Sequence, residues 1–297
     1  MTSRTFLVDG ATRGIGYAVS PLLHRQGHRV VGIARHIEGV DFPGTLAACD
    51  LADLAQTAQV LNALEQEFDI DGIVNKAGIA SPQPLGQIDF ATLQNVFDLN
   101  VRAAIQVTQQ FVEAMKLRRY GRIVNICSRA IHGNVNRTAY FAASSALVGY
   151  TRTWAMELAG HGVTANAVAP GPVETALFRK TRPVGSEMER QVLATIPMRR
   201  LWQPDEIAAA VGFLLSEQAS YMTGQVLAED SGGSLGGHQK NQGPAPRWRQ
   251  TARRRRPFEP AQASFERERR IARTRIYPQP ARVYSGVFPT CSRIGSP

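Results

Sequence analysis

The sequence has few cysteines and no long apolar run. Its three cysteines, Cys49, Cys127 and Cys291, are scattered without CxxC spacing, which argues against a disulfide framework or a zinc site and makes a reduced, cytoplasmic setting the expectation. No apolar run reaches the ~18 residues that a membrane-spanning helix needs, and the N-terminus leads directly into a strand pattern instead of a secretory signal. We therefore expect no metal site and no membrane partner.

Residues 1–237 also lack an excess of positive charge, although the net charge of the whole chain is +10. Residues 1–237 hold 20 Lys and Arg against 21 Asp and Glu, whereas residues 238–297 hold 14 against 3. This Arg/Pro-rich tail has no sustained apolar face, so we expect it to be disordered. It can be an arm for nucleic acid or an anionic membrane, or an appended segment without selected function. We favour the second interpretation and expect no nucleic-acid partner.

Residues 1–237 contain alternating strand and helix patterns, and 43% of the whole chain is hydrophobic, enough for a substantial core. Residues 5–28 give an apolar strand, a glycine-spaced turn and a helix, and a second strand follows. Gly10, Gly14 and Gly16 have G-x-x-x-G-x-G spacing, which lets bare backbone approach a pyrophosphate at a helix N-terminus. An ordinary strand-to-helix turn is the alternative, but the complete βαβ unit favours dinucleotide binding.

The end of the second strand bears on the choice of cofactor. It finishes at Ala34 and Arg35, without the acidic residue that would accept the ribose 2′-hydroxyl of NAD. Arg35 and Arg13 can instead pair with a 2′-phosphate, so NADP(H) is the preferred cofactor. The alternative is that both arginines are solvated surface residues.

The later strand ends supply further polar or turn residues. One short strand is expected to end in Asp50 and Leu51, which suit an adenine edge and face, and residues 75–78 close another strand. The pattern over residues 92–116 predicts one long amphipathic helix, in which Asn100 has apolar neighbours and therefore a buried hydrogen-bonding task. Residues 176–203 are charged, poorly periodic and flanked by prolines, as in a mobile flap over a substrate.

The stretch from Ser128 to Ser144 holds the candidate catalytic residues. Ser128 ends a buried strand and Tyr140 opens an amphipathic helix, with a loop between them that can bring both hydroxyls above the carboxyl edge of a parallel sheet. Two hydroxyls in that arrangement can polarise a carbonyl group and donate a proton to its oxygen. A phenol has a reference pKa of about 10 and normally needs a nearby cation for this work. One helical turn on, however, stands Ser144.

In their order and spacing, these motifs resemble the short-chain dehydrogenase/reductase family over residues 1–237, and most of all its bacterial 3-oxoacyl-acyl-carrier-protein reductase type. The resemblance implies a single Rossmann-like domain, a doubly wound parallel sheet of about seven strands with helices on both faces, and a homotetramer built through the helices beginning near residues 91 and 139 and through the final strand. It also implies fatty acid biosynthesis, with a small-molecule or acyl-carrier-bound ketone as substrate.

The resemblance further implies residue roles. Tyr140 would be the proton donor, Ser128 would hydrogen-bond the substrate carbonyl, and Asn100 would hold a water in a proton relay. The implied cofactor-binding residues are Gly10, Thr12, Arg13, Gly14, Ile15, Gly16, Arg35, Asp50, Leu51, Asn75, Ala77, Gly78, Pro170, Gly171, Val173 and Thr175.

Three positions depart from the family pattern. Ser144 replaces the lysine whose ammonium binds the nicotinamide ribose and lowers the tyrosine pKa. Asp9 replaces a threonine and places a carboxylate beside the phosphate-binding turn, where we expect it to weaken NADP(H) binding. Lys76 replaces the second Asn of Asn-Asn-Ala-Gly, on a different loop from Ser144.

Two functions are therefore open. The first is an NADPH-dependent carbonyl reductase, which the retention of Ser128, Tyr140 and Asn100 favours. The second is a catalytically impaired relative that serves as a cofactor-binding or assembly subunit, which Asp9 and Ser144 favour.

Overall fold

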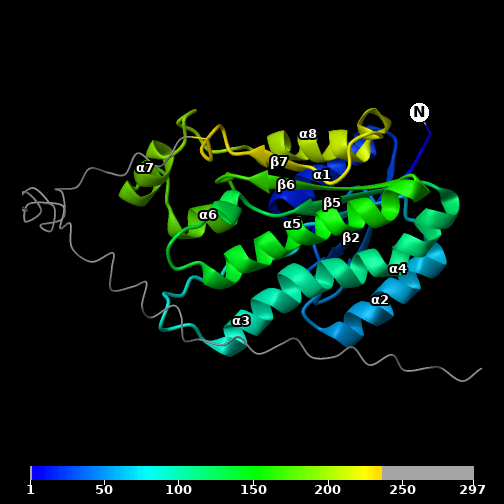
Figure 1. The fold of residues 1–297 in the computed structure, drawn as a ribbon, viewed down its shortest axis with the longest axis horizontal. Coiled ribbons are helices and arrows are strands. Elements are labelled where there is room, and N and C mark those ends of the chain that lie inside the picture. The colour runs from blue at the N-terminus through cyan, green and yellow to red at the C-terminus, as the bar shows by residue number, and fades with distance from the viewer. Residues whose placement is uncertain (1, 236–297) are drawn as a thin grey trace, which may run out of the picture. The chain divides into compact units, whose positions relative to one another are not determined.

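A computed structural model describes residues 2–235, whose backbone forms a doubly wound α/β fold (Figure 1). Seven parallel strands make one sheet in the order β3-β2-β1-β4-β5-β6-β7. The winding reverses between β1 and β4, the kind of point at which open α/β sheets bind ligands. The predicted fold class is confirmed, while the disorder predicted for residues 238–297 lies outside the described residues.

The elements have the following bounds. The strands are β1 (Thr5–Asp9), β2 (Arg29–Ala34), β3 (Thr45–Ala48), β4 (Gly72–Asn75), β5 (Gly121–Ile126), β6 (Val163–Pro170) and β7 (Val226–Glu229). The α-helices are α1 (Gly14–Arg25), α2 (Leu54–Glu67), α3 (Phe90–Phe97), α4 (Ala103–Arg118), α5 (Thr138–Leu158), α6 (Ala176–Thr181), α7 (Glu187–Ala194) and α8 (Pro204–Leu215). A π-helical turn, η1 (Asp98–Arg102), lies between α3 and α4.

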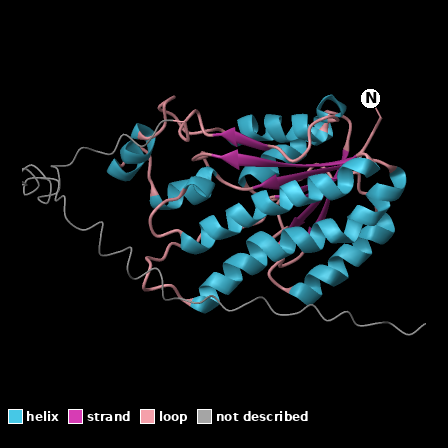
Figure 2. Ribbon diagram, viewed as in Figure 1, coloured by secondary structure: helices cyan, strands magenta, loops and turns pink. Residues whose placement is uncertain are grey.

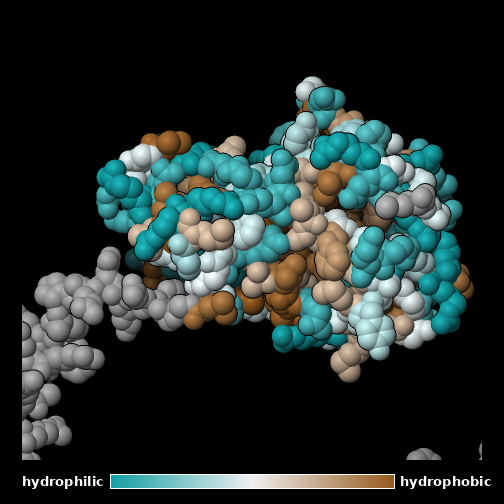
Figure 3. All heavy atoms as spheres, turned by 90° about the horizontal axis from the view of Figure 1, so that it is seen from above, coloured by the Kyte–Doolittle hydropathy of each residue, from teal (hydrophilic) through white to brown (hydrophobic). Residues whose placement is uncertain are grey.

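Helices cover both faces of the sheet because successive strand residues point to opposite sides. In β1, Leu7 belongs to the core cluster that includes side chains of α2, α4 and α5, whereas Phe6 and Val8 belong to the cluster of α1 and α8. Figure 1 shows α1 and α8 on one face and α2, α4 and α5 on the other. Hydrophilic side chains cover much of the surface seen from above in Figure 3, and apolar ones gather in a narrower patch.

Since every strand pair is parallel, the carboxyl ends of the strands share one edge of the sheet. In Figure 2 the visible arrowheads point toward the side on which α6 and α7 lie. The segment predicted as a charged flap, residues 176–203, contains these two short helices. Arg179 ion-pairs with both Glu174 and Glu189 and so ties α6 to α7 and to the loop before them.

The single helix predicted over residues 92–116 is interrupted, which corrects that expectation. The π-helical turn at residues 98–102 separates α3 from α4 and carries Asn100. π-turns are rare and occur frequently at functional sites. Within residues 2–235, no helix combines the length and apolarity needed to cross a membrane.

A buried polar network fixes the ends of β4 and β5 against the helices. The Asn75 amide donates to Thr108 Oγ1 at 3.1 Å and to Asn125 Oδ1 at 2.8 Å. Asn125 in turn donates to Thr151 Oγ1 at 2.9 Å, and Thr151 donates to the Leu147 carbonyl at 2.7 Å. Because buried polar groups are costly unless paired, this chain specifies how β4, β5, α4 and α5 pack.

Candidate active site

The hydroxyls of Ser128 and Tyr140 meet at the carboxyl edge of the sheet. Ser128 lies two residues beyond the end of β5, and Tyr140 lies in the first turn of α5. A side-chain hydrogen bond links the two residues. The structure thus brings together the pair that the sequence placed at a strand end and a helix start.

The environment of Tyr140 decides how readily its proton moves. Burial raises the pKa of the phenol above its ordinary value, and the neighbouring Cys127 raises it further. The hydrogen bond to Ser128 and the charge of Arg137 act in the opposite direction, but the net effect is a raised pKa. Arg137 is the N-cap residue of α5. Sequence reasoning gave Arg137 no role, although a basic residue three positions before Tyr140 was the available signal.

Ser144 lies one turn of α5 beyond Tyr140 and is 4% exposed. Residues four apart on a helix are neighbours. A residue with a neutral hydroxyl therefore lies on the same helix face as Tyr140, at the position where the family pattern has a lysine.

Asn100 has the buried hydrogen-bonding task that its sequence context predicts. It is 7% exposed, its Oδ1 accepts from the Ile79 amide at 2.9 Å, and its Nδ2 donates to the Ile79 carbonyl at 2.9 Å. A Cβ added to Gly78 would lie 3.3 Å from the Asn100 Cγ and Oδ1, so the two residues pack closely. Asn100 thus holds the loop after β4 against η1.

The glycine turn after β1 is closely packed at positions that require glycine. Gly10 and Gly14 have φ values of +58° and +57°, in the left-handed region that favours glycine. A Cβ on Gly16 would lie 2.5 Å from the Gly10 carbonyl oxygen. The turn leads into the N-terminus of α1, where the free backbone N–H groups attract anions. Thr12 is half-buried within the turn, and Ile15 packs in the core.

The predicted adenosine side lies beyond β2 and β3. Arg35 is exposed directly after β2, and Arg13 is exposed in the glycine turn. β3 ends at Ala48, two residues earlier than Asp50, so the predicted strand end was too late. Asp50 Oδ1 accepts from the Ala52 amide at 3.1 Å, while the Leu51 side chain is 3% exposed and packs in the core.

Residues 170–175 reach from the end of β6 to the glycine turn. Pro170 ends β6, and the Gly171 amide donates to the Glu229 carbonyl at 2.8 Å. Val173 forms an isolated parallel bridge with Trp202. The Thr175 hydroxyl caps α6, and the Thr175 methyl lies 3.4 Å from where a Cβ on Gly14 would be. Thr175 therefore stands beside the turn, as a residue near the nicotinamide end would.

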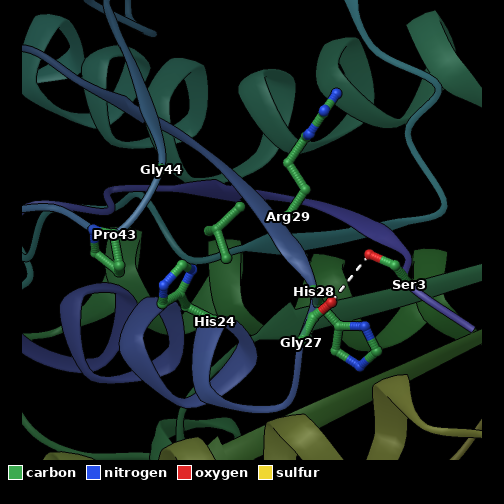
Figure 4. A pocket seen from close by; sticks show the side chains of 8 residues that line it. Ser3, His24, Gly27, His28, Arg29, Pro43 and Gly44 are labelled. Carbon is green, nitrogen blue, oxygen red and sulfur yellow. Dashed lines mark hydrogen bonds between the residues drawn. The ribbon is translucent and has the colours of Figure 1, made fainter. Parts of the chain in front are cut away.

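Two surface hollows are lined by residues other than Ser128 and Tyr140. One of about 430 Å³ lies beside the glycine turn and is lined by Gly14, Tyr17, Glu174 and Thr175 among others. The other, of about 390 Å³, lies at the opposite, amino edge of the sheet between Ser3, His24, His28 and Pro43 (Figure 4). The second hollow lacks the strand ends that carry the candidate residues. Within residues 2–235, no three His, Cys, Asp or Glu side chains are grouped to hold a metal ion.

Comparison with known proteins matches this geometry. Residues 10–234 match the family model described as enoyl-(acyl carrier protein) reductase. The 3-oxoacyl-[acyl-carrier-protein] reductase FabG of Vibrio cholerae is 34% identical over 241 residues, covering 78% of this chain and 98% of the relative.

Solved structures agree. A protein described as a putative NAD(P)-dependent gluconate 5-dehydrogenase from Beutenbergia cavernae, with bound NADP, has a TM-score of 0.75 and 36% identity over 80% of this chain and 98% of its own. A short chain dehydrogenase/reductase family protein has a TM-score of 0.72 and 34% identity, covering 78% of this chain and 98% of its own. On this match of sequence and fold, the chain belongs to the short-chain dehydrogenase/reductase family of oxidoreductases.

Proposed function

We propose that the chain reduces a ketone with hydride from NADPH, and that the ketone is a 3-oxoacyl thioester carried by acyl carrier protein. The observation that carries the proposal is the hydrogen-bonded Ser128–Tyr140 pair at the carboxyl edge of the sheet, the edge at which the glycine turn also lies. The Vibrio cholerae relative, named for this reaction, supports the substrate class. The direct test is NADPH oxidation with an acetoacetyl thioester, followed as loss of absorbance of the reduced nicotinamide. No oxidation above the enzyme-free rate would contradict the proposal.

Three residues of the chain have separate roles in the proposed reduction. Ser128 donates a hydrogen bond to the carbonyl oxygen, and Tyr140 donates its proton to that oxygen as the alcohol forms. NADPH supplies the hydride when bound. Asn100, held by Ile79, positions the water through which Tyr140 is reprotonated. Ordinary donation of this kind contributes about 10²–10⁴-fold to a rate.

The glycine turn fits the diphosphate of a dinucleotide, because it leads into a helix N-terminus whose free backbone N–H groups attract anions. Ile15, Gly16 and Thr12 shape the turn, residues 75–78 lie at the adenosine ribose, and Asp50 with the Leu51 backbone lies at the adenine. Pro170, Gly171, Val173 and Thr175 lie at the nicotinamide end. Arg35 and Arg13 bind the 2′-phosphate that distinguishes NADPH from NADH.

Replacing Arg35 with Asp should shift cofactor preference toward NADH. The substitution removes a cation from the 2′-phosphate and adds a carboxylate that accepts the ribose hydroxyl. We expect the ratio of the NADPH to the NADH dissociation constant to rise about tenfold or more. Arg29→Asp makes the same charge change at the opposite end of β2 and is the matched control. An unchanged ratio for Arg35→Asp would remove the 2′-phosphate assignment.

We also propose that the chain forms a homotetramer in the cytoplasm. Leu117 on α4 and Met156 on α5 are 86% and 83% exposed, as suits faces that pack against other copies. Cys49 and Cys127 are free and buried, in keeping with a reducing compartment. Light scattering of the purified chain should give four times the chain mass, and a monomer mass would refute the assembly.

Ser144 favours the second candidate, an impaired relative that binds cofactor or assembles with others without ordinary turnover. With no lysine beside Tyr140, the phenol keeps a raised pKa. The two candidates make opposite predictions for a lysine introduced at residue 144.

A further inference from the structure

Asp9 and Lys76, two charged residues near the glycine turn that depart from the family pattern, interact with each other. Asp9 ends β1, is 1% exposed, and its Oδ1 accepts hydrogen bonds from the backbone amides of both Lys76 and Ala77. The Asp9 carboxylate is thus directed at the loop after β4. Two backbone amides hydrogen-bond the Asp9 carboxylate, and the charge of Lys76 acts on it, while the expectation that Asp9 weakens NADP(H) binding stays a prediction.

The Lys76 side chain lies across the turn itself. Its Cδ and Nζ lie 3.1 and 3.4 Å from where a Cβ on Gly10 would be, and its Nζ donates to the Arg13 carbonyl at 3.5 Å. A cation therefore occupies the bare backbone surface between Gly10 and Arg13, next to the N-terminus of α1.

The charges of the pair depend on each other. Burial raises the pKa of Asp9 to about 6, and the two amides and the Lys76 charge act against that rise. Burial lowers the pKa of Lys76, and Arg13 lowers it further, whereas Asp9 raises it. An anion arriving at the turn would add a second negative charge beside the ammonium group and favour its protonated form.

We propose that Lys76 is a ligand of the dinucleotide diphosphate, and that Asp9 is the positioning residue that holds the Lys76 loop at the turn. This inference rests on the proposed function insofar as a dinucleotide is the ligand. It adds a side-chain cation to a site otherwise made of backbone N–H groups. NADPH and NADH carry the same diphosphate, so Lys76 contributes equally to both, unlike Arg35.

Lys76→Met should weaken binding of NADPH and of NADH by the same factor. A charged hydrogen bond of the usual strength corresponds to about a tenfold to hundredfold loss in affinity. Titrations following nucleotide fluorescence measure both constants without turnover. Binding of adenosine 2′-phosphate, which lacks the diphosphate, should not change. Lys76→Arg keeps a cation and should keep most of the affinity, while Lys116→Met, on α4, is the matched control.

The outcomes separate the two proposals. If the native chain binds neither nucleotide, the proposed function fails and this inference fails with it. If the native chain binds NADPH and Lys76→Met binds it equally well, only the inference fails. An equal loss for adenosine 2′-phosphate would also overturn the inference, because it would show a general distortion of the site.

The Asp9 part has its own measurement. In a double-mutant cycle with Asp9→Ala and Lys76→Met, the two losses in affinity for NADPH should not add, because removing the acceptor of the Lys76 and Ala77 amides already releases the loop that carries Lys76. Asp9→Asn keeps an oxygen that can accept from the same amides and should keep most of the affinity. Additive losses would overturn the pairing.

Discussion

Replacing Ser144 with lysine is expected to raise turnover several hundredfold or more. The residue lies one turn after Tyr140 on α5 and is buried, whereas Tyr140 is half-buried. A unit charge about 4 Å from a phenolate is worth on the order of 4 kcal/mol at an effective dielectric near 20, which converts to a rate factor of that size. The new ammonium group would lower the pKa of Tyr140, now raised by burial.

The measurement is the steady-state rate of NADPH oxidation with an acetoacetyl thioester. Ser145→Lys is the matched control, because Ser145 is the next residue on the same helix but is exposed. A large gain for Ser144→Lys with none for Ser145→Lys identifies the native chain as the impaired form. Ordinary turnover by the native chain, with no gain from lysine, would mean that Arg137 or another group already meets the need for a cation.

Replacing Tyr140 with Phe is expected to remove nearly all reductase activity. The change deletes the donor oxygen and its hydrogen bond to Ser128 but keeps the ring that packs against Phe141. Loss of a general acid costs about 10²–10⁴-fold in rate. NADPH binding should persist, since the phenol lies outside the glycine turn.

Paired rate and binding measurements distinguish this loss from misfolding. Tyr150→Phe, also on α5, removes a hydroxyl from a ring stacked on Trp154 and serves as the control. Ser128→Ala should also lower the rate, by removing the polarising hydrogen bond. If Tyr140→Phe retains native turnover, another group donates the proton and the assignment of the site is wrong.

The sequence pattern predicted the fold and the Ser128–Tyr140 pair, because both depend on local signals. Apolar strands followed by helices predict a parallel sheet, and the ends of such strands share an edge, so Ser128 and Tyr140 could be placed together. The π-helical turn at residues 98–102 could not be foreseen, because one extra residue in a turn leaves helical periodicity almost intact.

Contacts between distant parts of the chain were also beyond prediction. Asp9 and Lys76 are far apart in sequence, and their sequence positions did not show that the Asp9 carboxylate binds the backbone amide of Lys76. The Asn75 side chain was expected only near a cofactor, yet it is committed to Thr108 and Asn125 in the core. Such partners are set by which strands become neighbours, and single-residue patterns do not record that choice.

The raised pKa of Tyr140 has a consequence for the direction of the reaction. A phenol with a raised pKa is a weaker acid but keeps the protonated form that reduction needs up to higher pH, whereas the reverse step, oxidation of an alcohol, needs the phenolate to receive a proton. At neutral pH the donor form dominates. The buried tyrosine thus biases the site toward making alcohols, and alcohol oxidation would become appreciable only in alkaline solution.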